Sequence, residues 1–218
     1  MATMGRPRTF DRDAAVTQAM HLFWEHGFDA TSLAQLKDGL GGGISAPSFY
    51  AAFGSKEALF QESVARYLAT HGQVTDCLQD TTLAPHDAIE TALRRSAGMQ
   101  CAPDHPRGCM VSLGVMSAPS PANATVAQPL HDSRAKTSAG LLACVRRGIA
   151  AGELDPDTDV LALATVFDSF LTGLSTLARD GADAARLDAA VTQVMRLWDA
   201  ARPGKKRTGK PPVKRTIS

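Results

Sequence analysis

Apolar residues recur every three or four positions along most of the chain, which is the spacing of amphipathic α-helices. Pro and Gly interrupt this pattern repeatedly, and no segment alternates apolar and polar residues as a half-buried strand does. We therefore predict an all-α protein of about nine helices. The expected parts are a three-helix domain in residues 1–54 that begins with a basic arm (1–10), a larger helical domain (55–201) and a disordered basic tail (202–218).

Capping residues define the helices of the predicted N-terminal domain. The first helix should begin after Asp11 and end at His26, because Gly27 adopts a left-handed conformation at little cost. Thr31 is expected to cap the second helix and Ser45 the third, with a Gly-rich segment between them. Two short helices joined by such a turn predict a helix-turn-helix.

The larger domain is predicted to hold six further helices. Their expected ranges are 55–72, 85–101, 109–116, 122–151 with a bend or late start at Gln128-Pro129, one that begins after Asp159, and 184–201. The last two carry more apolar side chains than one buried face requires, which favours a subunit interface over a monomeric core. The predicted interface residues are Leu163, Phe170, Leu174, Leu187, Val191, Val194, Met195 and Trp198.

The third helix is predicted to be a DNA recognition helix, whose N-terminal side chains reach base edges in the major groove. Tyr50 and Lys56 suit phosphate oxygens, and Arg6 and Arg8 suit the minor groove. The predicted DNA contacts are Arg6, Arg8, Thr31, Ser32, Ser45, Ala46, Pro47, Ser48, Tyr50 and Lys56. The alternative is that the aromatic residues of this helix are only the core of a helical hairpin.

Residues 10–60 resemble the N-terminal domain of the TetR family of bacterial transcription regulators. The resemblance depends on Leu22-Phe23, Gly27-Phe28, Thr31-Ser32, Ser45, Tyr50, Phe53 and Lys56-Glu57 taken together. It implies a homodimeric, effector-controlled regulator of double-stranded operator DNA, most commonly a repressor, in which the last two helices of each chain form a four-helix bundle. Gly42 and Gly43 are extra relative to the family's usual turn.

The resemblance also implies an effector cavity among helices four to eight of the larger domain. The residues expected to line it are Cys109, Met110, Leu113, Met116, Leu142, Arg147, Phe167 and Phe170. Most of these side chains are apolar, so an apolar or aromatic small molecule of unknown identity is expected.

The net charge of +1 conceals an asymmetry. Residues 202–215 hold seven cations and no acid, so the rest of the chain is acidic. An acidic body repels DNA, and binding would have to come from a few placed cations and the termini. The tail is predicted either to add nonspecific attraction to DNA or only to aid solubility.

Cys101, His105 and Cys109 form a Cys-x3-His-x3-Cys pattern in a Pro-rich loop. These are soft ligands that suit zinc or copper, but the spacing matches no compact zinc site. Cys109 also follows Arg107 at a predicted helix start, where a thiolate would be stabilised. A redox-sensing or metal-sensing regulator is therefore the rival function, and a buried structural cysteine is the simpler reading. We predict no bound metal and no cofactor.

An enzymatic function is disfavoured, because the chain has no Gly-rich phosphate loop, no GxSxG and no HExxH. A thiol-dependent enzyme using Cys109 is the distant alternative. The chain has no uninterrupted apolar run of about 18 residues and no signal-peptide pattern at its start, which predicts no membrane association and a cytoplasmic location.

Overall fold

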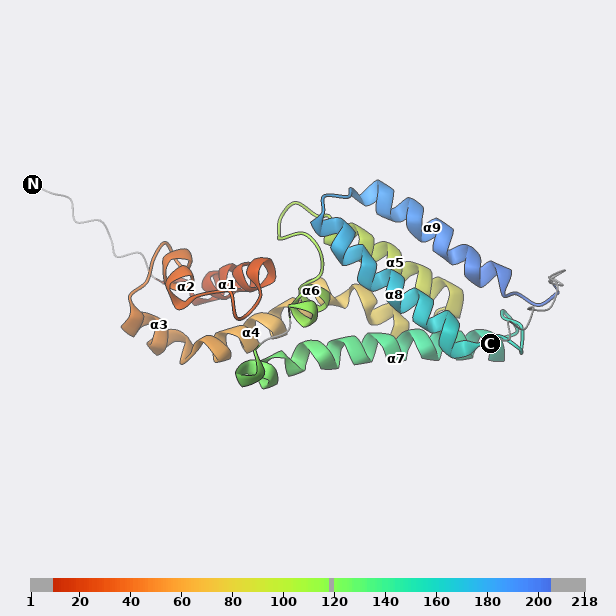
Figure 1. Cartoon of the computed structure of the whole chain (residues 1–218), viewed down its shortest axis with the longest axis horizontal. Helices are drawn as coiled ribbons and strands as arrows, with labels where there is room; N and C mark the ends of the chain where they lie inside the picture. Colours follow the sequence, from red (N-terminus) through yellow and green to blue (C-terminus); the bar gives the residue numbers. More distant parts are fainter. Residues whose placement is uncertain (1–9, 118–119, 205–218) are drawn as a thin grey trace, which may run out of the picture.

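The computed structural model describes residues 10–117 and 120–204. These ranges contain no strand, and they hold nine α-helices and two 3₁₀-helices (Figure 1). In chain order the elements are α1 (Arg12–His26), α2 (Leu33–Gly39), α3 (Ala46–Phe53), α4 (Lys56–Ala69), η1 (His71–Gln79), α5 (Pro85–Gln100), α6 (Met110–Met116), η2 (Pro121–Ala127), α7 (Gln128–Ala150), α8 (Val160–Arg179) and α9 (Ala184–Ala200). The all-α prediction is confirmed.

Side-chain caps fix the starts of most helices where the sequence places them. The Asp11 carboxylate accepts a hydrogen bond from the Ala14 amide at 3.0 Å, and the Asp159 carboxylate accepts one from the Ala162 amide at 3.0 Å. Gly27 ends α1 with a φ of 79°. The long predicted helix over 122–151 is divided at its Gln128-Pro129 step, because η2 precedes α7.

Two apolar clusters hold the molecule together. The first joins α1, α2, α3 and α4 and also takes in Met110, Val111 and Leu130. The second joins η1, α5, α7, α8 and α9. Because the first cluster continues into α4 and α6, the helix that follows residue 54 shares a core with the N-terminal helices. The boundary at residue 54 stays a prediction.

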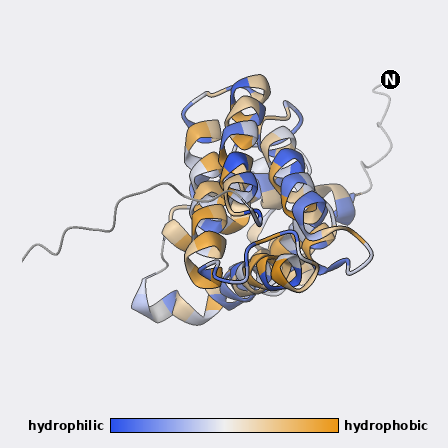
Figure 2. Ribbon diagram, turned by 90° about the vertical axis from the view of Figure 1, so that its right-hand side faces the viewer, coloured by the Kyte–Doolittle hydropathy of each residue, from blue (hydrophilic) through white to orange (hydrophobic). Residues whose placement is uncertain are grey.

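The larger domain packs α5 between α7, α8 and α9, and α4 runs from below the N-terminal helices toward it (Figure 1). Hydrophobic and hydrophilic residues alternate around these helices, as Figure 2 shows. Glycines permit close approaches within this packing: a Cβ at Gly148 would lie 2.6 Å from the Trp198 ring. The arm residues Arg6 and Arg8 and residues 205–218 of the predicted tail lie outside the described ranges.

Candidate nucleic-acid interface and ligand cavity

Helix α3 has one buried face and one exposed face. Phe49 and Phe53, four residues apart, are buried in the N-terminal cluster. Ser45, Pro47 and Ser48 are exposed at the start of the helix, and Tyr50 is 51% exposed. Ala46 is half-buried. The helix therefore presents its first turn to solvent, which is the arrangement that a recognition helix requires.

The Ser45 hydroxyl has a structural role in this first turn. Its Oγ accepts a hydrogen bond from the Ser48 amide at 3.2 Å and lies 2.9 Å from the Ser48 hydroxyl. The two hydroxyls together fix the start of α3, and both remain at the exposed surface. The surface offered to a ligand is thus small, neutral and hydroxyl-rich, with the Tyr50 phenol beside it.

The extra glycines form an ordered turn between α2 and α3. Gly41, Gly42 and Gly43 have φ values of 59°, 81° and 103°, which side-chain-bearing residues rarely adopt. The turn is closed by hydrogen bonds from the Gly43 amide to the Leu40 carbonyl at 2.9 Å and from the Ile44 amide to the Lys37 carbonyl at 2.8 Å. The longer turn is therefore compatible with two regular flanking helices.

The structure corrects the two roles predicted for Thr31. Ser32, not Thr31, caps α2, and it forms a reciprocal capping box with Gln35. Thr31 is fully buried, and its hydroxyl donates to the Gly27 carbonyl at 2.7 Å. The hydroxyl is satisfied inside the domain, so this side chain has no surface to offer to DNA. Ser32 is exposed, and its contact with DNA stays a prediction.

Lys56 opens α4, three residues after the end of α3. Its Nζ lies 4.3 Å from the centroid of the Phe28 ring. Burial lowers the pKa of Lys56, and the carboxylates of Asp29 and Glu57 partly oppose that shift. Lys56 as a whole is half-exposed, and its contact with a phosphate stays a prediction.

Two arginine pairs fix α1 against α4. Arg12 donates to both carboxylate oxygens of Glu62, at 2.6 and 2.7 Å, and its Nε donates to the Ala52 carbonyl at 3.2 Å. Arg66 pairs with Asp13 and donates to the Thr17 hydroxyl at 2.8 Å. These pairs connect the helix that leads into the larger domain directly to the helix-turn-helix.

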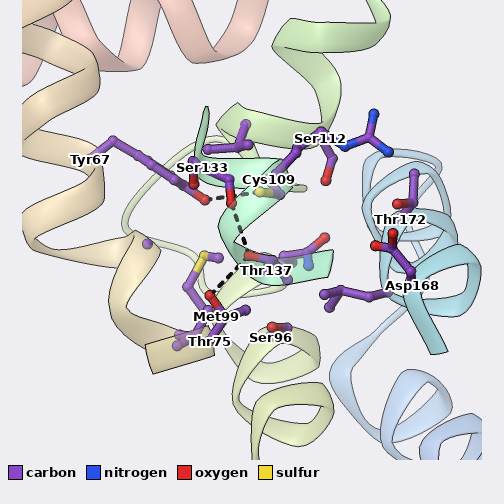
Figure 3. A pocket seen from close by; sticks show the side chains of 16 residues that line it. Tyr67, Thr75, Ser96, Met99, Cys109, Ser112, Ser133, Thr137, Asp168 and Thr172 are labelled. Carbon is purple, nitrogen blue, oxygen red and sulfur yellow. Dashed lines mark hydrogen bonds between the residues drawn. The ribbon is translucent and has the colours of Figure 1, made fainter. Parts of the chain in front are cut away.

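A cavity of about 50 Å³ lies between α4, η1, α5, α6, α7 and α8. Figure 3 shows polar side chains from several of these helices around it. Apolar contacts come from Met99, Val111 and Leu171. Its polar side includes Ser96, Gln100, Ser112, Thr137 and Asp168. A wider groove of about 410 Å³ adjoins the cavity, and the two share Gly72, Thr75, Ser133 and Thr137.

The predicted lining of the cavity is mostly wrong. Among the eight predicted residues, only Cys109 lines it. Met110 faces the N-terminal cluster instead, Met116 is 51% exposed, and Phe167 is buried against α9. Arg147 donates to the Asp80, Thr81 and Leu83 carbonyls and so holds the segment before α5. Leu142 and Phe170 pack against the second cluster, and Leu113 lies against Gly108.

The prediction failed because the sequence does not determine how each helix is rotated about its own axis. A spacing of three or four residues shows that a helix has an apolar face, but it does not show which neighbour that face contacts. The polar residues that the prediction missed could have been found from the sequence. Ser96 and Gln100 continue the spacing of Ile89, Ala92 and Leu93, and so lie on the same buried face of α5. Two polar residues on a buried stripe indicate either a partner or a cavity.

The structure separates the three residues of the Cys-x3-His-x3-Cys pattern. Cys101 Sγ donates to the Ala182 carbonyl at 3.4 Å, and His105 is stacked on Trp24 with ring centroids 4.5 Å apart. Cys109 Sγ accepts a hydrogen bond from the Tyr67 hydroxyl at 3.2 Å (Figure 3). Arg107, expected beside the thiol, instead donates to the Ala178 carbonyl at 2.8 Å. The three side chains do not form a shared metal site.

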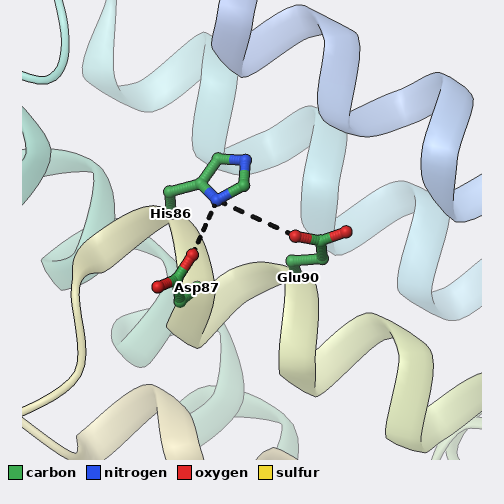
Figure 4. Close-up of side chains that lie close together, drawn as sticks. All are labelled: His86, Asp87 and Glu90. Atoms are coloured by element: carbon green, nitrogen blue, oxygen red, sulfur yellow. Dashed lines mark hydrogen bonds and ion pairs between the residues drawn. The ribbon is translucent and has the colours of Figure 1, made fainter.

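Within the described ranges, one group of His, Cys, Asp and Glu has its ligand atoms within 4.8 Å of one another: His86, Asp87 and Glu90 (Figure 4). His86 Nδ1 lies 3.0 Å from an Asp87 oxygen. The Glu90 carboxylate accepts hydrogen bonds from Arg94 at 2.7 and 3.0 Å. Since a guanidinium already neutralises Glu90, this cluster is explained by ion pairing on the surface of α5.

The predicted interface residues on α8 and α9 are partly corrected. Leu174, Leu187, Val191, Met195 and Trp198 are buried in the chain's own core, because α8 and α9 turn these side chains toward the rest of the larger domain. Leu163, Phe170 and Val194 are half-buried. The apolar side chains that remain exposed are Leu161, Val166, Leu177 and Leu197, and we call these four residues the apolar face of α8 and α9.

Residues 15–63 match the bacterial regulatory proteins of the tetR family, and residues 85–194 match the tetracyclin repressor-like C-terminal domain. The HTH-type transcriptional repressor ComR of Escherichia coli (strain K12) is 34% identical over 198 residues, which cover 89% of this chain and 91% of ComR. The chain belongs to the TetR family. The HTH-type transcriptional repressor BdcR of the same strain is 40% identical over 118 residues, or 52% of this chain and 56% of BdcR.

A solved TetR-family structure gives the same fold. A cysteine mutant of the TetR family transcriptional regulator CifR, complexed with 26-bp double-strand operator DNA, is 38% identical and superposes with a TM-score of 0.76. The match covers 89% of this chain and 100% of that chain. The helix-turn-helix and the larger helical domain are therefore the two parts of one TetR-family protein.

Proposed function

We propose that this protein is a dimeric transcription repressor that binds operator DNA through α3 and is released by a small molecule bound in the cavity. The division of α3 into a buried face with Phe49 and Phe53 and an exposed face with Ser45, Ser48 and Tyr50 carries the proposal. The relatives ComR and BdcR are named repressors, and the CifR structure contains operator DNA. Absence of enzymatic activity and a cytoplasmic location stay predictions.

The mechanism is competition between two states of the dimer. Operator DNA selects the state in which the two α3 helices are separated by about 34 Å, one turn of B-DNA. The effector selects a different separation, because the cavity contacts α4 through Tyr67 and α4 is tied to α1 by the Arg12–Glu62 pair. Each ligand then weakens the binding of the other by the same factor.

Binding to the DNA upstream of the protein's own coding region tests this function. Fluorescence anisotropy with that duplex should show saturable binding that a scrambled duplex does not compete away. Tyr50→Ala should weaken binding by about tenfold through loss of a phosphate contact. Met116→Ala is the control, because Tyr50 and Met116 are equally exposed, at 51%. Equal affinity for both duplexes would refute the proposal.

A thiol switch at Cys109 is the second candidate for control of the same repressor. The position of Cys109 supports this candidate, because Cys109 lines the cavity and its Sγ accepts a hydrogen bond from the Tyr67 hydroxyl. Burial, and secondarily the nearby Cys109, raises the pKa of Tyr67 well above its ordinary value, so the phenol stays protonated as a donor. Cys109→Ser separates the two candidates: a noncovalent effector still releases the variant from DNA, whereas a thiol-modifying agent does not.

A further inference from the structure

We propose that the effector is a compact, neutral molecule with a hydroxyl, carbonyl or amide group at one end and an apolar body, and that Ser96 and Gln100 bind its polar end. The inference rests on the proposed function, since it identifies the kind of ligand that the cavity accepts. It differs from the apolar or aromatic effector expected from the sequence, because the cavity has a polar wall.

The polar wall begins with two side chains of α5 that lack partners. Ser96 and Gln100 lie one helical turn apart and are only 1% and 2% exposed. The Ser96 hydroxyl oxygen and the Gln100 amide oxygen make no hydrogen bond within residues 10–117 and 120–204. Buried polar groups in native proteins are nearly always hydrogen-bonded, so two neighbouring exceptions on a cavity wall indicate that a ligand supplies their partner.

The ligand's polar group is neutral because its partners are neutral. A serine hydroxyl and a primary amide can each donate and accept hydrogen bonds, but neither carries a charge. An ion placed against Ser96 and Gln100 would lose its hydration without gaining a counter-ion from either residue, which is costly in a buried site. The charged groups of the cavity, Arg134 and Asp168, come from α7 and α8, and Asp168 already accepts from the Ser138 hydroxyl at 2.6 Å.

The size of the cavity limits the ligand to a compact molecule. One water needs roughly 10–15 Å³ of cavity volume, so a cavity of about 50 Å³ has room for roughly three to five water-sized groups. Met99, Val111 and Leu171 provide apolar contacts for its body. A longer or bulkier ligand would have to extend into the adjoining groove.

That groove is the route of entry. It shares Thr75 and Thr137 with the cavity, and the hydroxyls of these two residues meet at 3.5 Å between η1 and α7 (Figure 3). A contact of this length is weak and separates easily. The ligand therefore enters between η1 and α7, past the Thr75–Thr137 contact.

Four probes of similar length test the inference on the full-length protein. Butyramide and 1-butanol are neutral, whereas butyrate and butylammonium carry opposite charges. Thermal unfolding in the presence of each probe measures binding, and anisotropy of the upstream duplex measures release from DNA. The neutral probes should raise the melting temperature in a concentration-dependent manner and release DNA, whereas the charged probes should do neither.

Ser96→Ala and Gln100→Leu should each raise the concentration of butyramide needed for half of the thermal shift by about tenfold. Ser175→Ala is the matched control. Ser175 is also fully buried and its hydroxyl also lacks a partner within the described chain, but it does not line the cavity. The control should keep the wild-type response to butyramide.

The inference is overturned if no neutral probe binds, if butyrate or butylammonium binds as well as butyramide, or if Ser96→Ala and Gln100→Leu respond like the wild type. Each of these results leaves the repressor function intact when the same preparation binds the upstream duplex. Loss of DNA binding by the unliganded wild-type protein would instead count against the proposed function.

Discussion

Lys56 shows how one residue serves both packing and recognition. Its ammonium lies against the Phe28 ring, and burial lowers its pKa. The carboxylates of Asp29 and Glu57 partly oppose this shift, and the ring face offers the ammonium a favourable contact. The side chain is therefore already ordered before DNA arrives, which reduces the entropy lost when it binds a phosphate.

We predict that Lys56→Gln weakens binding to all DNA sequences alike. A plot of log affinity against log salt concentration has a negative slope. Loss of one phosphate contact per subunit should make this slope less steep by about 1 per subunit. Titrations of the upstream duplex at several salt concentrations measure this slope. Arg146→Gln removes a cation from the exposed surface of α7 and serves as the control. A similar change of slope in both variants would mean that only net charge matters.

Three histidines meet around Trp24 at the junction of the two domains. The ring centroids of His71 and His105 lie 4.5 Å apart, and His71 lies 5.2 Å from Trp24. Burial, followed by electrostatic repulsion from His105, lowers the pKa of both His21 and His71. The folded protein thus favours the neutral form of these two rings.

We predict that the protein loses stability as the pH falls below about 6.5, the ordinary pKa of histidine. Below that pH the unfolded chain binds protons that the folded His21 and His71 resist, so protonation favours unfolding. Urea unfolding between pH 7.5 and 5.5 measures how steeply the free energy of unfolding falls with pH. His71→Gln should reduce this steepness, whereas His131→Gln, at an exposed position of α7, should leave it unchanged.

Ser175 and Ser63 are both fully buried, but among the described residues only one of their two hydroxyls makes a hydrogen bond. The Ser175 hydroxyl has no partner within the described chain, whereas the Ser63 hydroxyl donates to the Leu59 carbonyl at 2.7 Å. We predict that Ser175→Ala raises the free energy of unfolding by about 1 kcal/mol, because it removes an unsatisfied polar group. Ser63→Ala should not raise it. Urea unfolding of both variants gives the comparison, and a loss of stability in Ser175→Ala would contradict the argument.

At the scale of elements, α8 connects the cavity to the helix-turn-helix domain. Leu171 and Thr172 of α8 line the cavity. Two turns later, Arg179 donates to the Trp24 carbonyl at 2.9 Å and to the Glu25 carbonyl at 3.1 Å. These carbonyls belong to the last turn of α1, where a cation is favoured by the helix dipole. The contact is a further connection between the domains, in addition to α4.

We predict that Arg179→Met lowers the free energy of unfolding by about 1–2 kcal/mol, because its charge-assisted hydrogen bonds to the Trp24 and Glu25 carbonyls are lost. Amide hydrogen exchange should rise at the end of α1, and mass spectrometry of peptides from residues 20–28 measures it. Arg202→Met is the control, since Arg202 pairs with Asp199 at the surface and half of each side chain is exposed. Unchanged exchange at the end of α1 would rule out a coupling role for Arg179.

At the scale of the whole molecule, the apolar face of α8 and α9 requires a covering partner. Leu161 is 69% exposed, and Val166, Leu177 and Leu197 are each at least 40% exposed. By length and composition α8 alone among the described helices is long and apolar enough to cross a membrane. The resemblance to the TetR family instead leads us to predict that the last two helices of a second copy cover this apolar surface.

We predict that the double variant Val166→Glu and Leu177→Glu dissociates the dimer, because it places two charges on the apolar surface that the second copy is predicted to cover. Analytical ultracentrifugation should show a shift from dimer to monomer, with loss of binding to the upstream duplex. Met116→Glu places a charge on an exposed apolar residue outside this face and should remain dimeric. A dimeric double variant would locate the interface elsewhere.

The sequence by itself determined the helices, their caps and the helix-turn-helix. These features depend on local physics, because an Asp or Ser side chain binds amides only a few residues away and a glycine ends a helix by its own conformational freedom. The predicted starts after Asp11, Ser45 and Asp159 therefore agree with the structure. Thr31 was misassigned because its neighbour Ser32 offers the same cap, and only packing decides which hydroxyl turns inward.

Only the tertiary structure decided which side of α8 and α9 is buried and which residues surround the cavity. A helix that is apolar on most sides has no sequence signal for its rotation, so Val191 and Trp198 were assigned to an interface although they lie in the core. The cavity joins residues from six elements that are distant in sequence, including Tyr67, Ser96 and Asp168. Contacts of this kind arise when helices pack, because their positions depend on the shapes of all neighbouring side chains.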